Sequence, residues 1–230
     1  MSELTRPGGP LARRPLHFIW IADCSGSMSG EKISILNQAI RTTIPHMREV
    51  AANNPHAEVL VRAVAFSDGA RWQMTQPTEI EKFEWQDLEA FGHTDMGKAF
   101  NLVAAQLAVP PMSERALPPI LVLLSDGQPT DDYDYGLQQL LALPWGKKAV
   151  RLAIAIGRDA EKGPLQKFIG NPEIRPLEAH NAEALIAYIH WVSTAVLKAA
   201  SSPDSSPQLA AGGGNVILPP APDVDANVIW

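Results

Sequence analysis

Two short stretches of this sequence are apolar almost without alternation, and they constrain the fold more than any other feature. One runs from Leu16 to Asp23 and the other covers residues 120–124, Ile-Leu-Val-Leu-Leu. Strands that alternate apolar and polar residues have one face in water, whereas continuous apolar runs are typical of strands covered by helices on both faces. Residues 57–66 and 149–156 are predicted strands of the same sheet.

Helical patterns separate these strands. Ile33, Leu36, Ile40, Ile44 and Met47 recur at intervals of three or four residues, which predicts a helix with one apolar stripe. Pro45 is expected to kink or end that helix. Further helices are predicted over four ranges: 96–107, capped by Thr94 or Asp95, 131–143, 163–169 and 182–199.

The alternation predicts an α/β fold with a doubly wound, mostly parallel sheet and helices on both faces. The turn Ser67-Asp68-Gly69 should return residues 70–74 as one antiparallel edge strand. Residues 78–85 are predicted as a short helix or a strand remnant, and residues 174–177 as a short edge strand.

The composition divides the chain into three parts. Residues 1–14 are a predicted flexible lead-in, residues 15–199 one domain, and residues 200–230 a linker rich in Ser, Pro and Gly with an apolar tail. Disorder is the default expectation for that tail. Its last residues, Val228-Ile229-Trp230, could alternatively dock on a partner or on a sheet edge.

Charge and cysteine content narrow the class of protein. The net charge is −6 without an extended basic cluster, which argues against nucleic acid or an anionic membrane as the main partner. Cys24 is the single cysteine, so an internal disulfide is excluded and a reducing compartment is favoured. No signal-peptide pattern precedes residue 16, and the apolar runs are too short to span a bilayer. We therefore expect a cytoplasmic protein.

Oxygen-bearing side chains follow the predicted strands in three loops. The first carries Asp23, Ser25 and Ser27, the second Thr94, and the third Asp126. In doubly wound sheets ligands bind outside the carboxyl ends of the strands, so these side chains are expected to converge. Carboxylate and hydroxyl oxygens suit Mg²⁺, Mn²⁺ or Ca²⁺. An acidic group of a partner could displace water from such an ion and complete its shell.

These loops resemble the metal-ion-dependent adhesion site of the von Willebrand factor A (VWA) domain family, whose fold is Rossmann-like. The family pattern is Asp-x-Ser-x-Ser, a threonine on a second loop and an aspartate on a third. Residues 92–99, Gly-His-Thr-Asp-Met-Gly-Lys-Ala, and residues 125–131, Ser-Asp-Gly-Gln-Pro-Thr-Asp, match the second and third elements. His93 stands where glycine is frequent. The resemblance covers residues 15–199 and implies Ser25, Ser27 and Thr94 as hydroxyl ligands, with Asp23 and Asp126 acting directly or through water.

Within that family the sequence is most similar to intracellular bacterial members associated with tellurite resistance. The similarity lies in the strand that leads into Asp23-Cys24-Ser25-Gly26-Ser27-Met28 and in the Leu-Ser-Asp-Gly-Gln-Pro-Thr-Asp stretch. It implies a scaffold that acts beside a protein kinase and a phosphatase, as part of a stress response.

Three functions remain open at this stage. The leading one is a non-enzymatic module that binds a partner's Asp or Glu through a bound cation. The second is a metal-dependent hydrolase or phosphatase, although no general base, nucleophile or phosphate-binding loop is recognisable. The third is a scaffold that binds mainly through its tail. Cys24 is interpreted as a small packed residue because neighbouring carboxylates oppose thiolate formation. His93 is interpreted either as a residue that touches the ligand-binding face or as an exposed loop residue.

Overall fold

The apolar runs form the middle of one seven-stranded sheet. The computed structural model describes residues 13–201 and 217–224. The strand order is β3-β2-β1-β5-β6-β7, with β4 also paired to β2. The strands are β1 (Arg14–Asp23), β2 (Ala57–Ser67), β3 (Gly69–Trp72), β4 (Thr78–Glu79), β5 (Ile120–Ser125), β6 (Val150–Ile156) and β7 (Leu177–Ala179).

The sheet is parallel from β2 to β7, and only β3 and β4 run antiparallel to β2. The predicted α/β fold with an antiparallel edge strand is therefore confirmed. Residues 78–79 form the strand remnant that was one of the two alternatives for residues 78–85, and they pair with the amino-terminal half of β2 beyond the reach of β3.

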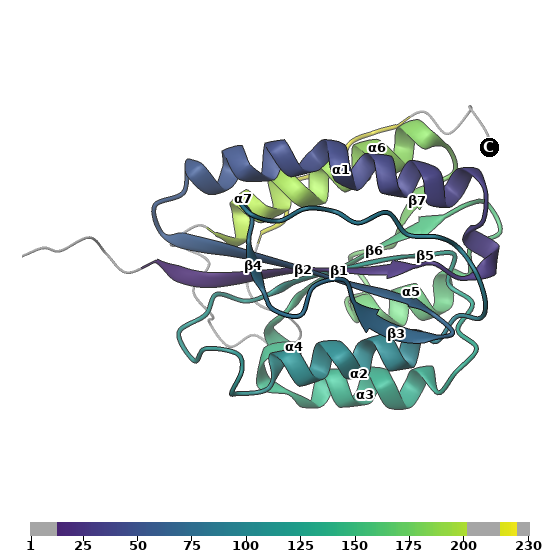
Figure 1. Cartoon of the computed structure of the whole chain (residues 1–230), viewed down its shortest axis with the longest axis horizontal. Helices are drawn as coiled ribbons and strands as arrows, with labels where there is room; N and C mark the ends of the chain where they lie inside the picture. Colours follow the sequence, from purple (N-terminus) through teal and green to yellow (C-terminus); the bar gives the residue numbers. More distant parts are fainter. Residues whose placement is uncertain (1–12, 202–216, 225–230) are drawn as a thin grey trace, which may run out of the picture.

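Helices cover both faces of the sheet (Figure 1). In Figure 1, α1, α6 and α7 lie on one face, and α2, α3 and α4 on the other. The helical segments are η1 (Gly26–Met28), α1 (Glu31–Ala52), α2 (Met96–Leu107), α3 (Tyr133–Ala142), α4 (Pro144–Lys148), α5 (Lys162–Ile169), α6 (Ala182–Trp191), η2 (Val192–Val196) and α7 (Leu197–Ala200).

The central strand shows why its sequence does not alternate. Phe18 and Trp20 belong to the apolar cluster shared with α1 and α6. Ile19 and Ile21 point the other way, into the cluster shared with α2, α3 and α5. Both faces of β1 are buried, so an apolar residue is favoured at nearly every position.

Two predictions about element boundaries need correction. Helix α1 continues through Pro45 to Ala52, so the proline does not end it. Pro45 has no N–H to donate to the Arg41 carbonyl, but both residues are exposed, so water can replace the missing donor. Met47 and Ala51 anchor the last turns of the helix in the core. The last edge strand begins at Leu177, where pairing with β6 starts, and not at residue 174.

The described part of the tail lies against the domain. Leu218 and Val224 pack on the apolar cluster of α1 and α6, where the sequence predicted only a spacer. Val228-Ile229-Trp230 fall outside the described residues. None of the helices in the described ranges combines the length and the apolar character needed to cross a membrane.

Candidate functional site

The first loop is built around the carboxylate of Asp23, the last residue of β1. Its Oδ1 accepts the backbone N–H of Ser25 at 2.8 Å, and its Oδ2 accepts the hydroxyl of Ser125 at 2.5 Å. The turn that follows brings the hydroxyls of Ser25 and Ser27 to 3.0 Å from each other. Asp23 thus shapes the loop and links it to the end of β5.

The second loop is held against the first and the third through its backbone. The N–H of Gly26 donates to the carbonyl of Gly92 at 3.0 Å. Thr94 and Thr130 form a reciprocal pair: Thr94 N–H donates to the Thr130 hydroxyl, and Thr130 N–H donates to the Thr94 carbonyl, both at 2.9 Å. Both bonds use the backbone of Thr94, so its hydroxyl is not needed to hold the loop.

The third loop begins at Asp126, directly after β5. Asp126 is only 4% exposed. Gly127 has a φ of +82°, and a Cβ at that position would lie 2.0 Å from the Glu161 carbonyl oxygen. Glycine is therefore required here, because it turns the chain sharply beneath the neighbouring loop.

The structure brings the predicted residues together. Ser25, Ser27 and Thr94 line one open hollow, whose remaining wall includes Gln128 and Thr130. Asp23 and Asp126 are buried at the adjoining strand ends, close enough that the charge of Asp126 acts on Asp23. All five candidate residues therefore belong to one site.

The electrostatics of this site favour an additional cation. Burial raises the pKa of the Asp23 carboxyl to about 6, and the charge of Asp126 adds to the rise while the hydrogen bonds from Ser125 and Ser25 oppose it. Within the described residues, the buried Oδ1 atom of Asp126 has no hydrogen-bond partner. A buried carboxylate oxygen without a partner is costly, and a bound cation would remove that cost.

A lysine that the sequence analysis missed also faces this site. Lys32 Nζ lies 3.7 Å from Asp126 Oδ2 and 3.5 Å from Asp159 Oδ1. Lys32 is the second residue of α1. A positive charge is unfavourable in the first turn of a helix unless an acid faces it. The unusual position of Lys32 could therefore have indicated that an acidic side chain lies opposite it.

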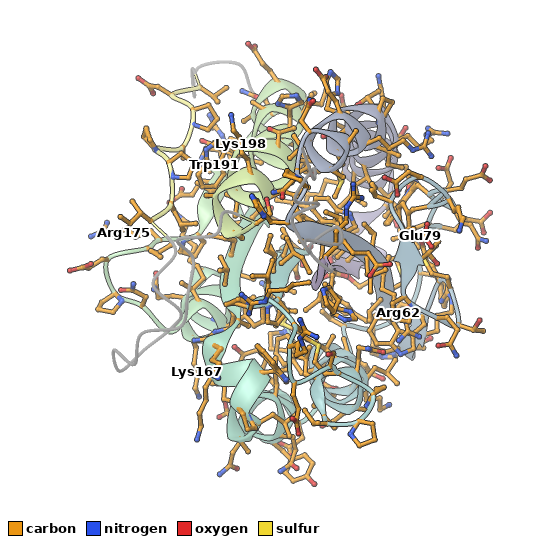
Figure 2. The ribbon with its side chains drawn as sticks, turned by 90° about the vertical axis from the view of Figure 1, so that its left-hand side faces the viewer. Arg62, Glu79, Lys167, Arg175, Trp191 and Lys198 are labelled. Carbon is orange, nitrogen blue, oxygen red and sulfur yellow. The ribbon has the colours of Figure 1, made fainter. Side chains whose placement is uncertain are left out.

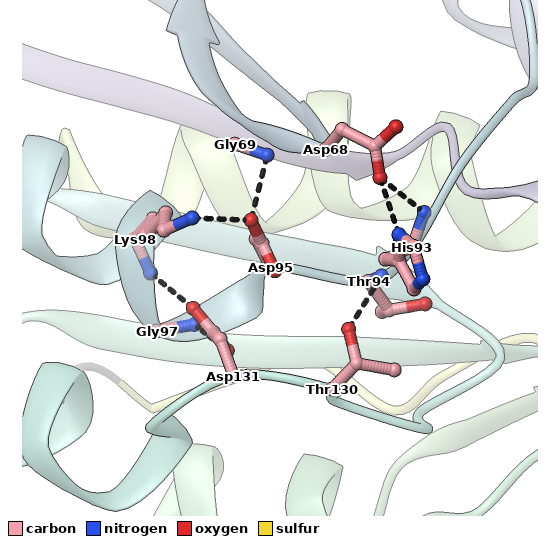
Figure 3. Close-up of polar contacts among 9 residues, drawn as sticks. All are labelled: Asp68, Gly69, His93, Thr94, Asp95, Gly97, Lys98, Thr130 and Asp131. Atoms are coloured by element: carbon pink, nitrogen blue, oxygen red, sulfur yellow. Dashed lines mark hydrogen bonds and ion pairs between the residues drawn. The ribbon is translucent and has the colours of Figure 1, made fainter.

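A set of polar contacts on the rim fixes the second loop (Figure 3). Asp131 accepts the N–H groups of Gly97 at 2.9 Å and Lys98 at 2.8 Å, and so caps α2 from another loop. Asp95 occupies the N-cap position of α2, but its carboxylate binds Gly69 N–H and Lys98 Nζ instead. Asp95 thus stands at the predicted N-cap position, but its side chain makes no capping hydrogen bond to α2.

His93 and Cys24 have simple surroundings. Asp68 accepts both the N–H of His93 and its ring Nδ1, at 2.8 and 2.6 Å. The His93 side chain is 76% exposed and also lines the hollow with Ser25 and Thr94, so both interpretations of His93 fit. The Cys24 thiol is buried and donates to the Phe66 carbonyl at 3.3 Å, and burial raises its pKa. Both features disfavour a reactive thiolate.

The donor set is compatible with a hard divalent cation. The described residues contain no group of three or more His, Cys, Asp or Glu side chains suited to a metal. The candidate site instead combines two carboxylates with three hydroxyls, a composition that fits Mg²⁺ or Mn²⁺ far better than zinc.

Comparison with known proteins agrees with this architecture. A family model described as the von Willebrand factor type A domain matches residues 19–187. A search of curated protein sequences finds no match.

Several solved structures share the fold. A von Willebrand factor type A protein from Catenulispora acidiphila is 18% identical, with a TM-score of 0.58 over 82% of this chain and 43% of that chain. The ArnB paralog VWA2 from Sulfolobus acidocaldarius is 19% identical, with a TM-score of 0.56 over 77% and 44%.

The PilB minor pilin from Streptococcus sanguinis is 15% identical, with a TM-score of 0.62 over 85% of this chain and 64% of the pilin. The chain thus spans less than half of the first two proteins. At such identities the likeness concerns the fold alone.

Proposed function

We propose that this chain, which belongs to the von Willebrand factor type A domain family, is a protein-binding module that engages an acidic residue of its partner through a divalent cation. The family assignment follows from the match over residues 19–187. The dependence on a metal is our inference from the candidate site.

The observation that carries the proposal is the buried, unpartnered Oδ1 of Asp126. Folded proteins rarely leave a carboxylate oxygen buried without a donor. Lys32 Nζ, at 3.7 Å from the other oxygen, offsets the charge of Asp126 but is beyond hydrogen-bond distance. A cation that binds here would satisfy the oxygen and balance the second buried carboxylate, Asp23.

The side chains that would hold the cation are those of Ser25, Ser27 and Thr94, with Asp23 and Asp126 as direct or water-mediated ligands. Mg²⁺ is the expected ion, with Mn²⁺ or Ca²⁺ as substitutes. Three hydroxyls and two carboxylates supply at most five of the six oxygens that Mg²⁺ takes. When bound, the ion would offer a coordination position to a partner's carboxylate.

The loop that contains Asp126 also suggests which kind of partner to test first. Its similarity to the tellurite-resistance group leads us to propose a cytoplasmic stress-response complex with a protein kinase or phosphatase as partner. We further propose that the domain itself is not an enzyme, since the sequence carries no recognisable nucleophile motif or phosphate-binding loop. His93 and Glu161 line the same hollow as the hydroxyls, so an activity assay is needed to test this point.

Cation binding is tested with Mn²⁺ and the full chain. Electron paramagnetic resonance should detect one Mn²⁺ per chain that Mg²⁺ displaces, and the site should be lost in Asp126→Ala and weakened in Thr94→Val. Asp134→Ala is the matched control, because Asp134 is an exposed acid of α3 that pairs with Lys167. Unchanged Mn²⁺ binding in both site variants would contradict the proposal.

The carboxylate-binding step has its own measurement. Glutarate should lower the water-proton relaxation enhancement of bound Mn²⁺, because its carboxylate replaces a water on the ion. The same samples are tested for Mg²⁺-dependent hydrolysis of p-nitrophenyl phosphate. Turnover that disappears in Asp126→Ala would instead favour the metal-dependent hydrolase.

A further inference from the structure

An apolar groove separates α1 from α6, on the face of the sheet opposite α2 and α3. It has a volume of about 900 Å³. Small side chains, among them Ala39 of α1 and Ala187 of α6, leave the space, and Ile186 and Trp191 supply apolar walls. Ile186 is 37% exposed, which is high for a large aliphatic residue.

Two buried polar atoms belong to residues that line this groove. Thr43 Oγ1 and Trp191 Nε1 have no hydrogen-bond partner among the described residues, although both atoms are inaccessible to solvent. Thr43 as a whole is only 2% exposed. Because neither atom is open to solvent, neither can reach an occupant of the groove. The groove therefore offers its occupant mainly apolar contacts, which suit a peptide with apolar side chains.

The tail of this chain already reaches the groove. Pro222 forms part of its wall, and Leu218 and Val224 pack on the apolar cluster beneath it. In Figure 2, Trp191 lies between the last helices and the 217–224 segment. A peptide that continues from Val224 therefore starts at the groove, with almost no loop to close.

We propose that residues 225–230, Asp-Ala-Asn-Val-Ile-Trp, bind in this groove and cover it in cis. Six extended residues span about 20 Å. The stretch of α6 and η2 that lines the groove, residues 182–195, is also about 20 Å long at 1.5 Å per residue. Val228, Ile229 and Trp230 bury their side chains against Ile186 and Trp191.

Disulfide trapping in the full chain tests this contact. Val228→Cys is combined with Ala187→Cys in one protein and with Ala195→Cys in a second, and cross-linking in oxidised glutathione is followed by mass spectrometry. The native Cys24 is buried and does not compete. The cross-linking rate of each cysteine pair is compared with and without Ile229→Asp, which keeps the length of the tail but removes an apolar side chain. The same comparison is made with Asn227→Asp, which adds the same charge without removing an apolar side chain.

At least one pair should form an intramolecular cross-link about tenfold faster than its Ile229→Asp version, and Asn227→Asp should leave that rate unchanged. Equal rates with and without Ile229→Asp in both pairs would overturn the proposal. Cross-links that form only between two molecules would also overturn it and assign the groove to a second copy of the chain.

Discussion

Replacing Asp23 by asparagine should stabilise the protein in EDTA and at the same time abolish any stabilisation by Mg²⁺. The Asp23 side chain is fully buried. Asparagine keeps an oxygen for the Ser25 N–H, and the Ser125 hydroxyl can rotate to accept from the new amide instead of donating. The substitution therefore removes a charge while it keeps the shape of the loop.

The magnitude follows from the pKa of Asp23, which burial raises from 3.8 to about 6. A folded-state pKa above the unfolded value means that the stability contribution is complete below pH 3.8 and is lost as the pH rises through 6. Two pKa units correspond to about 3 kcal/mol at pH 7. Allowing about 1 kcal/mol for a weaker hydrogen bond, we expect a net gain of about 2 kcal/mol in Asp23→Asn.

Urea unfolding followed by circular dichroism measures this gain. In EDTA the wild type should lose stability between pH 4 and pH 7 through this group, whereas Asp23→Asn should lack that component. A gain of about 2 kcal/mol corresponds to a melting temperature roughly 4–8 °C higher for a domain of this size. Millimolar Mg²⁺ should stabilise the wild type by mass action and leave the variant unchanged.

Two results would refute this reasoning. A lower stability of Asp23→Asn in EDTA would mean that the loop needs the negative charge itself. Equal stabilisation of both proteins by Mg²⁺ would place the cation elsewhere. Asp134→Asn, at an exposed acid, should change neither quantity by more than about 0.5 kcal/mol.

Four further substitutions probe the same structure. Lys32→Met should tighten Mn²⁺ binding several-fold in calorimetry, because the ammonium 3.7 Å from Asp126 opposes a second cation there. Burial lowers the pKa of His17 from 6.5 to about 4, and the charge of Arg62 adds to this effect. The free energy of unfolding of the wild type should therefore fall by up to about 3 kcal/mol as the pH falls from 6.5 to 4, whereas His17→Gln should not show this loss. Gly97→Ala should lower the stability by about 2 kcal/mol or more, since its Cβ would lie 2.5 Å from a backbone carbonyl oxygen. Gly163→Ala has open space around its Cβ and should raise the stability by up to about 1 kcal/mol.

These variants have matched controls. Arg41→Met removes another cation of α1, which pairs with Asp87 at 3.1 Å, and should not alter Mn²⁺ affinity. Weaker Mn²⁺ binding in Lys32→Met would show that the lysine supports the site. For the loss of stability between pH 6.5 and 4, His46→Gln is the control, because it replaces an exposed histidine and should lose stability as the wild type does. A Gly97→Ala protein as stable as Gly163→Ala would contradict the close approach of α2 to the third loop.

The strands could be predicted from local sequence, and so could the meeting of the five candidate residues at one edge of the sheet. A continuous apolar run marks a buried strand, and a parallel sheet places the ends of neighbouring strands at one edge. The roles of Asp131 and Lys32 could not be predicted in this way. Asp131 caps a helix that begins 35 residues earlier, at Met96. A local pattern therefore pointed to the nearest helix, α3, which Asp132 caps instead through Tyr135 N–H at 3.1 Å.

The same contacts that escaped prediction explain how the loops can hold a cation. Ser125 links the first loop to β5, Thr130 links the third loop to the second, and Asp131 fixes the start of the helix after Thr94. The hydroxyls of Ser25, Ser27 and Thr94 are thus positioned by backbone and carboxylate bonds before any ion binds. A fixed donor loses little entropy on binding, so the proposed cation would meet ligands that are already in place. The coordination position that the five candidate side chains leave open would then be available for a partner's carboxylate.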